Sequence, residues 1–364
     1  MLRRGLFFVI GLTAILIGSL AIFGFQLSIN DFIDPKIKFN LPPNAIPLRT
    51  ARVFPSEKDE KDGIYLGHAQ SMAVDAKGLF YVPDDRNDEV LVFSKEGRLA
   101  HRFGRAGQGP GDFLRPTGIA CGPDYVLVRE SQNMRFQFFS LTGKYQSGFR
   151  PSRYYDPFLV LGKTIVGAEA HDRPPNDEKN SSLITILDSE GRIQKMFGSV
   201  IDAPENDFVN SNRTCIALTK NNKLAVAFCC VPIIRLYTLD GLLVREIQTK
   251  SGIIDKFAPL DKAAINQLKT APNSPRGFLA NAIFADENGI YLAIAAATRI
   301  EILLLDDHGG VKQYYYKNLE AWLGCSGLYV ISEKGVKHFF ILRLNPQYAI
   351  EELVPGRSSD FSNK

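Results

Sequence analysis

The sequence predicts an all-β protein built from a repeated unit of four short strands. Turn glycines recur at similar intervals along most of the chain, and the segments between them are strand-like. The composition supports the same fold class, because 25 Phe, 13 Tyr, 30 Gly and 20 Pro are typical of many short strands joined by tight turns.

The chain begins with an apolar segment that predicts a membrane helix. Arg3 and Arg4 precede residues 5–25, which carry no charged side chain and would span roughly 31 Å as a helix, about one bilayer core. The positive-inside rule then keeps the N-terminus in the cytoplasm and places the rest of the chain outside it. An uncleaved anchor over residues 1–26 is favoured over a cleaved secretory signal, because the small-residue motif Ser19-Leu20-Ala21 lies inside the apolar run.

Residues 27–48 predict an extended tether between this anchor and a folded domain. They contain Pro35, Pro42, Pro43 and Pro47, which favour an extended chain. The domain itself is expected over residues 49–354, with a C-terminal tail over residues 355–364.

The best-defined repeat lies between Arg115 and Lys144. Strand-like segments at 118–121, 125–130 and 134–140 are separated by turn residues, and a fourth strand would follow the Thr142-Gly143 turn. Residues 71–103 repeat the same order. Each of these units predicts an antiparallel meander of four strands.

The glycine turn after the third strand gives the number of units. It occurs at Gly97, Gly143, Gly191, Gly241 and Gly309, which are 46, 48, 50 and 68 residues apart, and Asn345-Pro346 takes its place in a sixth unit. Repeats of four short strands at this spacing predict a six-bladed β-propeller. Residues 49–54 would close the ring as an outer strand beside the last unit, which leaves few free edges.

Residues 115–144 also resemble an NHL repeat. That pattern places Pro-x-Gly-Ile-Ala before the inner strand, here residues 116–120, and Asn-x-Arg before the third strand, here residues 133–135. The Gly-rich link over residues 103–113 is similar to the inter-blade connection of bacterial six-bladed propellers of that kind. The resemblance covers the first two blades and implies the same propeller fold.

One segment departs from the strand pattern. Residues 261–270 follow Pro259, place Ile265 and Leu268 three apart and precede Pro272, so they predict a short helix within an insert near residues 259–271. Insertions in repeat folds gather on one face, which is often the binding face.

Several kinds of chemistry lack their sequence pattern. The net charge of +4 comes without a dense basic cluster, so no nucleic-acid partner is expected. The five cysteines include no Cys-x-x-Cys pair, so zinc and redox motifs are absent. The Gly-rich run over residues 104–111 has no following Lys-Ser or Lys-Thr, which favours an inter-blade link over a phosphate site.

Two weaker metal hypotheses remain beside the prediction of no cofactor. Asp85, Asn87 and Glu89 alternate as oxygen ligands suited to calcium, but turns favour such residues anyway. Acidic residues and His171 within residues 169–177 could hold a metal, although a charged loop with prolines is usually only solvated. Adjacent Cys229 and Cys230 are expected to be buried free thiols.

The candidate binding site is the axial mouth, where the inner strand of each blade begins. Aligning the blades predicts a polar ring of mixed charge at this position. Its members are His68, Gln70, Arg115, Thr117, Tyr155, Arg213, Asn281 and Glu320.

The predicted function is a membrane-tethered, extracytoplasmic module that binds a protein, peptide or glycan on one axial face. The five histidines lie in no catalytic motif, so an enzyme is disfavoured but stays open. The alternatives are a propeller hydrolase or lyase with a site at the mouth, and a structural subunit of a membrane complex.

Overall fold

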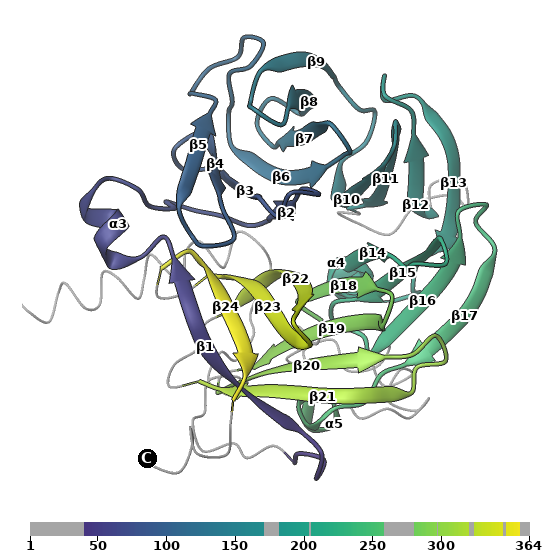
Figure 1. The fold of residues 1–364 in the computed structure, drawn as a ribbon. Helices are drawn as coiled ribbons and strands as arrows, with labels where there is room; N and C mark the ends of the chain where they lie inside the picture. The colour runs from purple at the N-terminus through teal and green to yellow at the C-terminus, as the bar shows by residue number, and fades with distance from the viewer. Residues whose placement is uncertain are drawn as a thin grey trace, which may run out of the picture.

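The structure is a computed structural model that describes residues 40–170, 182–203, 205–257, 280–296, 298–319, 324–344 and 347–356. Within these ranges the chain forms four-stranded antiparallel blades around a ring, as Figure 1 shows. The blades are numbered here in chain order. The predicted all-β propeller with four-stranded blades is confirmed.

The first four blades are regular meanders whose strands follow one another from the centre outwards. Blade 1 contains β2 (Ala73–Val74), β3 (Phe80–Asp84), β4 (Glu89–Phe93) and β5 (Leu99–Phe103), and blade 2 contains β6 (Pro116–Cys121), β7 (Tyr125–Glu130), β8 (Arg135–Ser140) and β9 (Tyr145–Phe149). Blade 3 contains β10 (Tyr155–Leu161), β11 (Thr164–Glu169), β12 (Ser182–Leu187) and β13 (Ile193–Ser199), and blade 4 contains β14 (Thr214–Leu218), β15 (Lys223–Phe228), β16 (Ile233–Thr238) and β17 (Leu243–Gln248).

The last two blades share one eight-stranded sheet. Blade 5 contains β18 (Ala282–Asp286), β19 (Gly289–Ala296), β20 (Arg299–Leu305) and β21 (Val311–Asn318). Blade 6 contains β22 (Cys325–Glu333), β23 (Val336–Arg343) and β24 (Ala349–Pro355), and its outer strand is β1 (Ile46–Phe54) from the beginning of the domain.

Strand β1 closes the ring. It runs antiparallel to β24, with Phe54 opposite Ile350, so the two ends of the domain share one blade as predicted for residues 49–54. Its first two residues also pair in parallel with Tyr315 and Tyr316 of β21, which joins blades 5 and 6. Because of this extra pairing, β1 begins at Ile46, within the region that the sequence analysis assigned to the tether.

Each periodic turn glycine fits against the outer strand of the preceding blade. At Gly143, φ is +83° and an added Cβ would lie 2.5 Å from Phe103, the last residue of β5. A side chain there would be strained by the backbone and would also collide with the ring, so only glycine suits the position. The same contact joins Gly191 to Phe149, Gly241 to Phe197 and Gly309 to Ile247.

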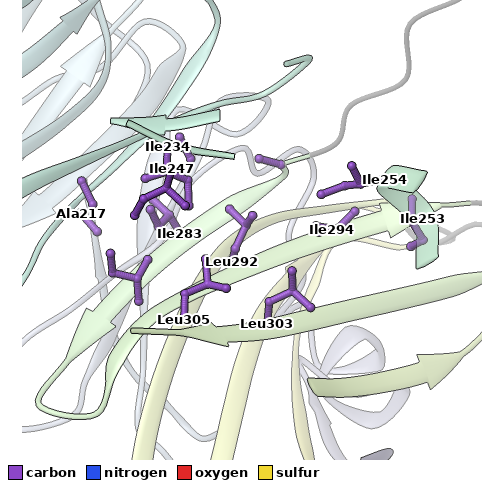
Figure 2. Packing of buried hydrophobic residues seen from close by; sticks show 14 of the residues in the cluster. Ala217, Ile234, Ile247, Ile253, Ile254, Ile283, Leu292, Ile294, Leu303 and Leu305 are labelled. Atoms are coloured by element: carbon purple, nitrogen blue, oxygen red, sulfur yellow. The ribbon is translucent and has the colours of Figure 1, made fainter. Parts of the chain in front are cut away.

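Apolar side chains fill the space between neighbouring blades. Figure 2 shows the cluster shared by blades 4 and 5, which includes Ile247, Leu292 and Leu305. The link between these blades contributes as well, because Ile253 and Ile254 of α5 (Gly252–Phe257) are fully buried in the same cluster. Burial of this apolar surface is the main stabilising term of such a fold.

The Gly-rich link between blades 1 and 2 is held by Arg135. The guanidinium donates to the carbonyl oxygens of Gln108 and Asp112 at 2.8 and 2.9 Å, and its Nε lies 2.6 Å from Oε1 of Glu130. The carbonyl oxygens of the link therefore bind an arginine side chain, so residues 104–113 have a structural role. It explains why Asn-x-Arg accompanies this link in the sequence.

Within the part of the chain that the structure describes, three short helices lie in connections: α3 (Glu57–Lys61), α4 (Glu205–Asn212) and α5. The link between blades 3 and 4 is thus helical in α4, whereas the corresponding link between blades 1 and 2 is a loop. The predicted helix at 261–270 and the apolar segment at 5–25 lie outside the described residues. Within the described ranges, no helix has both the length and the apolar character needed to cross a bilayer.

Candidate functional site

Polar contacts join neighbouring blades where their inner strands begin. Oγ of Ser71, just before β2, donates to the carbonyl oxygen of Thr117 in β6 at 3.0 Å. Arg129 of blade 2 donates to the carbonyl oxygen of Tyr155 in β10 at 2.6 Å. We call these strand starts, residues 68–71, 115–117, 153–156, 213–215 and 281, the axial mouth.

Asp85 brings together three of the predicted mouth residues. Its carboxylate lies 2.8 Å from Nδ1 of His68, accepts from Nε2 of Gln70 at 2.9 Å and pairs with Arg115 at 3.6 Å. Burial alone would raise the pKa of Asp85, but the hydrogen bonds from His68 and Gln70 and the charge of Arg115 hold it below its ordinary value. A charged carboxylate therefore lies beneath Arg115, whose side chain is 50% exposed.

The calcium ligands considered above do not gather in the structure. The side-chain amide of Asn87 donates to Asp84, and Glu89 pairs with Arg102 on the next strand. Asp84 in turn accepts from the backbone N–H groups of the segment before β2, so it fixes the start of the inner strand. Within the described ranges, no group of three His, Cys, Asp or Glu residues is arranged to hold a metal ion.

Arg129 joins blades 2 and 3 and is not among the predicted mouth residues. Its guanidinium donates to Oγ1 of Thr117 at 3.0 Å, pairs with Asp156 at 3.0 Å and lies 4.7 Å from the ring centre of Tyr154. The side chain of Arg129 is 3% exposed, whereas that of Asp156 is 48% exposed. The pair thus has one buried end within the blades and one end at the mouth.

Gly118 makes room for this arginine. An added Cβ at Gly118 would lie 3.1 Å from Cζ of Arg129 and 2.7 Å from the ring of Phe158. The glycine of the Pro-x-Gly-Ile-Ala motif therefore lets a guanidinium pack against the inner strand. The sequence signal that could have identified Arg129 is this glycine together with the consecutive residues Arg129 and Glu130 at the end of β7.

Blade 3 repeats the pairing of a buried acid with a more exposed arginine. Oε2 of Glu169 lies 2.7 Å from the guanidinium of Arg153, and Oε1 accepts from Oγ1 of Thr185 at 2.5 Å. Glu169 was considered above as a metal ligand together with residues 171–177. The structure buries it at the end of β11, and residues 171–181 lie outside the described ranges.

In blade 4 the mouth contains Arg213 and a pair of thiols. The Sγ atoms of Cys215 and Cys229 lie 3.6 Å apart, and both cysteines are free. The hydrogen bond from Cys215 lowers the pKa of Cys229, an effect that burial opposes and the charge of Arg213 supports. Cys230 is also free and buried, and both Cys229 and Cys230 lie in the link that follows β15.

Backbone hydrogen bonds show that Arg213 occupies the same position in its blade as His68 and Arg115 in theirs. The carbonyl oxygen of each accepts from the first residue after the second strand of its own blade. The sequence alignment placed Arg213 level with Thr117, two residues beyond Arg115, and a bulge in β6 between Pro116 and Gly118 accounts for one of these two residues. Arg115 and Arg213 are therefore equivalent positions of the repeat, and Tyr154 takes this position in blade 3, next to Arg153.

The remaining predicted residues have other surroundings. Tyr155 is fully buried and Thr117 is 6% exposed, so both support the mouth rather than line it. Oδ1 of Asn281 accepts from the backbone N–H of Ala295 at 2.8 Å, which fixes the start of β18. Glu320 lies outside the described residues.

Residues 66–150 match the DUF5128 family, which is described as a 6-bladed beta-propeller; the match covers less than half of the chain. No curated protein matches the sequence.

The chain is also similar to solved structures. One is a protein from Bacteroides fragilis NCTC 9343 whose name is "Putative exported protein". It has 10% identity, a TM-score of 0.54 and coverage of 87% of this chain and 98% of that chain. Another is a duf4221 family member from Bacteroides vulgatus ATCC 8482, with 11% identity, a TM-score of 0.53 and coverage of 86% and 98%. A third is an inactive virginiamycin B lyase variant from Staphylococcus aureus with quinupristin, with 15% identity, a TM-score of 0.49 and coverage of 79% and 80%. The blades of the structure agree with the six-bladed description of the matching family.

Proposed function

We propose that the chain is a membrane-tethered, extracytoplasmic binding module whose axial mouth takes an acidic region of a protein, peptide or glycan. The observation that carries this proposal is the presence of arginines at the mouth of three consecutive blades. These are Arg115, Arg153 and Arg213 of blades 2, 3 and 4.

The burial of the charges decides which sign faces outwards. Asp85 and Glu169 are 7% and 6% exposed, whereas the side chains of Arg115 and Arg153 are 50% and 28% exposed. In these two pairs the carboxylates hold the arginines from beneath and the guanidinium groups meet the solvent, whereas in the Arg129–Asp156 pair the carboxylate is the exposed end. Arginine pairs with carboxylate and sulfate groups through two parallel hydrogen bonds, so an acidic ligand suits this surface.

The location follows from the N-terminal sequence. Arg3 and Arg4 before the uncharged residues 5–25 favour an anchor with the propeller outside the cytoplasm. The name of the Bacteroides fragilis protein with a similar fold agrees with export. Protease added outside the inner membrane, after the outer layers are permeabilised, should digest the chain beyond Leu27; a protected propeller would contradict this topology.

A peptide of ten glutamates with a fluorescent label tests the mouth on the full-length protein in lipid nanodiscs. We expect the double variant Arg115→Glu and Arg213→Glu to weaken binding by roughly tenfold or more, because attraction becomes repulsion. The double variant Arg98→Glu and Lys144→Glu is the matched control, since both side chains are exposed in the turns between the third and fourth strands, at the other end of blades 1 and 2. Equal losses in the double variant and the control would show non-specific attraction and reject the proposed site.

A further inference from the structure

A second concave surface lies where the ring closes. A cavity of about 530 Å³ opens beside β1, β23, β24 and the β22–β23 turn, and small-molecule sites typically have volumes of roughly 300–1,000 Å³. We call it the seam pocket. The polar side of its lining consists of Arg49, Arg52, Glu333, Lys334, His338 and Glu352.

Contacts at the edge of the seam pocket join the last blade to the first. Glu333, at the end of β22, pairs with Lys95 of the β4–β5 turn at 2.9 Å. The guanidinium of Arg52 donates to the carbonyl oxygen of the same lysine at 3.0 Å. The pocket therefore adjoins the junction between blade 6 and blade 1. At this junction the outer strand of blade 6 is β1, which comes from the beginning of the domain.

The charges in the pocket are layered. Glu352 is 6% exposed, lies 2.7 Å from Nδ1 of His338 and pairs with Nε of Arg52 at 3.4 Å. Arg52 is 40% exposed, so the carboxylate lies beneath and the guanidinium lies towards the solvent. Lys95 pairs with Glu333 and so compensates its negative charge. The remaining lining side chains carry more positive than negative charge.

The rest of the lining is apolar. Ala51, Val336, Val354 and Pro355 contribute hydrocarbon surface, and Val336 is 44% exposed. Nδ1 of His338 is engaged by Glu352, so Nε2 of the neutral ring is an acceptor, and the donors for an acidic group are the lining cations. An occupant that complements these features has one acidic group and an apolar body.

We infer that the seam pocket binds a small amphipathic carboxylate. Its acidic group meets the cationic side of the pocket, and its apolar body covers the hydrocarbon lining. Such a ligand contacts β1 and β24 together, so its binding stabilises the closed ring and raises the midpoint of thermal unfolding. The inference does not depend on the function of the axial mouth.

Three probes with one phenylbutyl body separate the contributions of charge and shape. We expect 4-phenylbutyrate to bind the full-length protein in nanodiscs, as measured by calorimetry against empty nanodiscs, and to raise its unfolding midpoint. The alcohol 4-phenylbutanol should bind roughly tenfold more weakly because it lacks the charge-assisted contacts. The cation 4-phenylbutylamine should bind more weakly still.

Substitutions then locate the site. Val336→Glu places a negative charge in the lining and should weaken 4-phenylbutyrate binding by roughly tenfold or more. Val311→Glu is the matched control, because Val311 is 46% exposed at the start of β21 and is not among the lining residues. Lys334→Asn should cause a smaller loss, and asparagine suits the positive φ of 50° at that position.

Any of three results overturns the inference: no binding of 4-phenylbutyrate up to about 5 mM, binding of the amine as tight as that of the carboxylate, or equal effects of Val336→Glu and Val311→Glu. The double variant Arg115→Glu and Arg213→Glu should bind 4-phenylbutyrate like the wild type. Failure of the seam pocket and failure of the axial mouth are therefore distinguishable.

Discussion

Phe54, the last residue of β1, lies against Gly97 in the β4–β5 turn. An added Cβ on Gly97 would lie 2.9 Å from Cβ of Phe54. This is the contact that also joins Gly143 to Phe103 in the next pair of blades. The junction between the last and first blades therefore uses the same packing as the others, although the outer strand comes from the other end of the domain.

Phe54→Ala should lower the free energy of unfolding by about 3–5 kcal/mol, because it removes a buried ring from the closing contact. Phe54 is 1% exposed and packs with the core of blade 1. Urea unfolding of the full-length protein measures the change. Tyr65→Ala is the control, since Tyr65 is 47% exposed. Similar small losses in both variants would show that this contact does not hold the ring closed.

Gly143→Ala should destabilise the fold more than Gly335→Ala. The two glycines have nearly the same φ, +83° and +81°, so the backbone strain of an added side chain is the same. Only at Gly143 does an added Cβ meet a ring, that of Phe103 at 2.5 Å, while nothing lies within 4 Å at Gly335. We expect a loss of about 1 kcal/mol at Gly335 and about 2–4 kcal/mol at Gly143. Equal losses measured by urea unfolding would mean that the blades do not interlock at the turn.

The repeat could be predicted from the sequence because its markers have one physical cause. A turn glycine with positive φ that also packs against the preceding blade leaves no choice of residue, so it recurs even where other positions differ. The closing strand at 49–54 could be predicted because a propeller must join its two ends.

The details of the mouth could not be predicted in the same way. Arg129 ends an apolar run in β7, and besides Thr117 of its own blade its partners come from the neighbouring blade, namely Asp156 and the carbonyl oxygen of Tyr155. A bulge in β6 shifts the alignment of Arg213 with Arg115, and bulges leave no fixed sequence pattern. Pairing between blades and local register depend on tertiary structure, which spacing along the chain does not encode.

Arg129→Met should lower the free energy of unfolding by about 3–5 kcal/mol, because it breaks a buried ion pair and leaves Thr117 and Tyr155 without their shared donor. Arg129→Lys should lose part of this, since an ammonium cannot replace the planar fork. Arg102→Met is the control: Arg102 is 41% exposed in its pair with Glu89, and exposed pairs contribute about 0–1 kcal/mol. If Arg129→Met lowers the free energy of unfolding no more than Arg102→Met does, Arg129 does not hold blades 2 and 3 together.

Asp85 should make the stability of the propeller depend on pH in the acid range. Burial opposes the charge of Asp85, but His68, Gln70 and Arg115 together hold its pKa below the ordinary 3.8. A carboxyl whose pKa is lower in the folded state contributes stability that is fully present above 3.8 and is lost as the pH falls through the lower, folded value.

Asp85→Asn removes this contribution, so the variant should be less stable than the wild type at neutral pH. The gap should narrow between about pH 5 and pH 2, where the wild-type carboxyl takes up its proton. Urea unfolding at a series of pH values measures the gap, and Asp124→Asn, at an exposed turn between β6 and β7, is the matched control. A gap that stays constant down to the lowest pH, or that is equally present for Asp124→Asn, would mean that Asp85 is not the charged centre that holds Arg115 at the mouth.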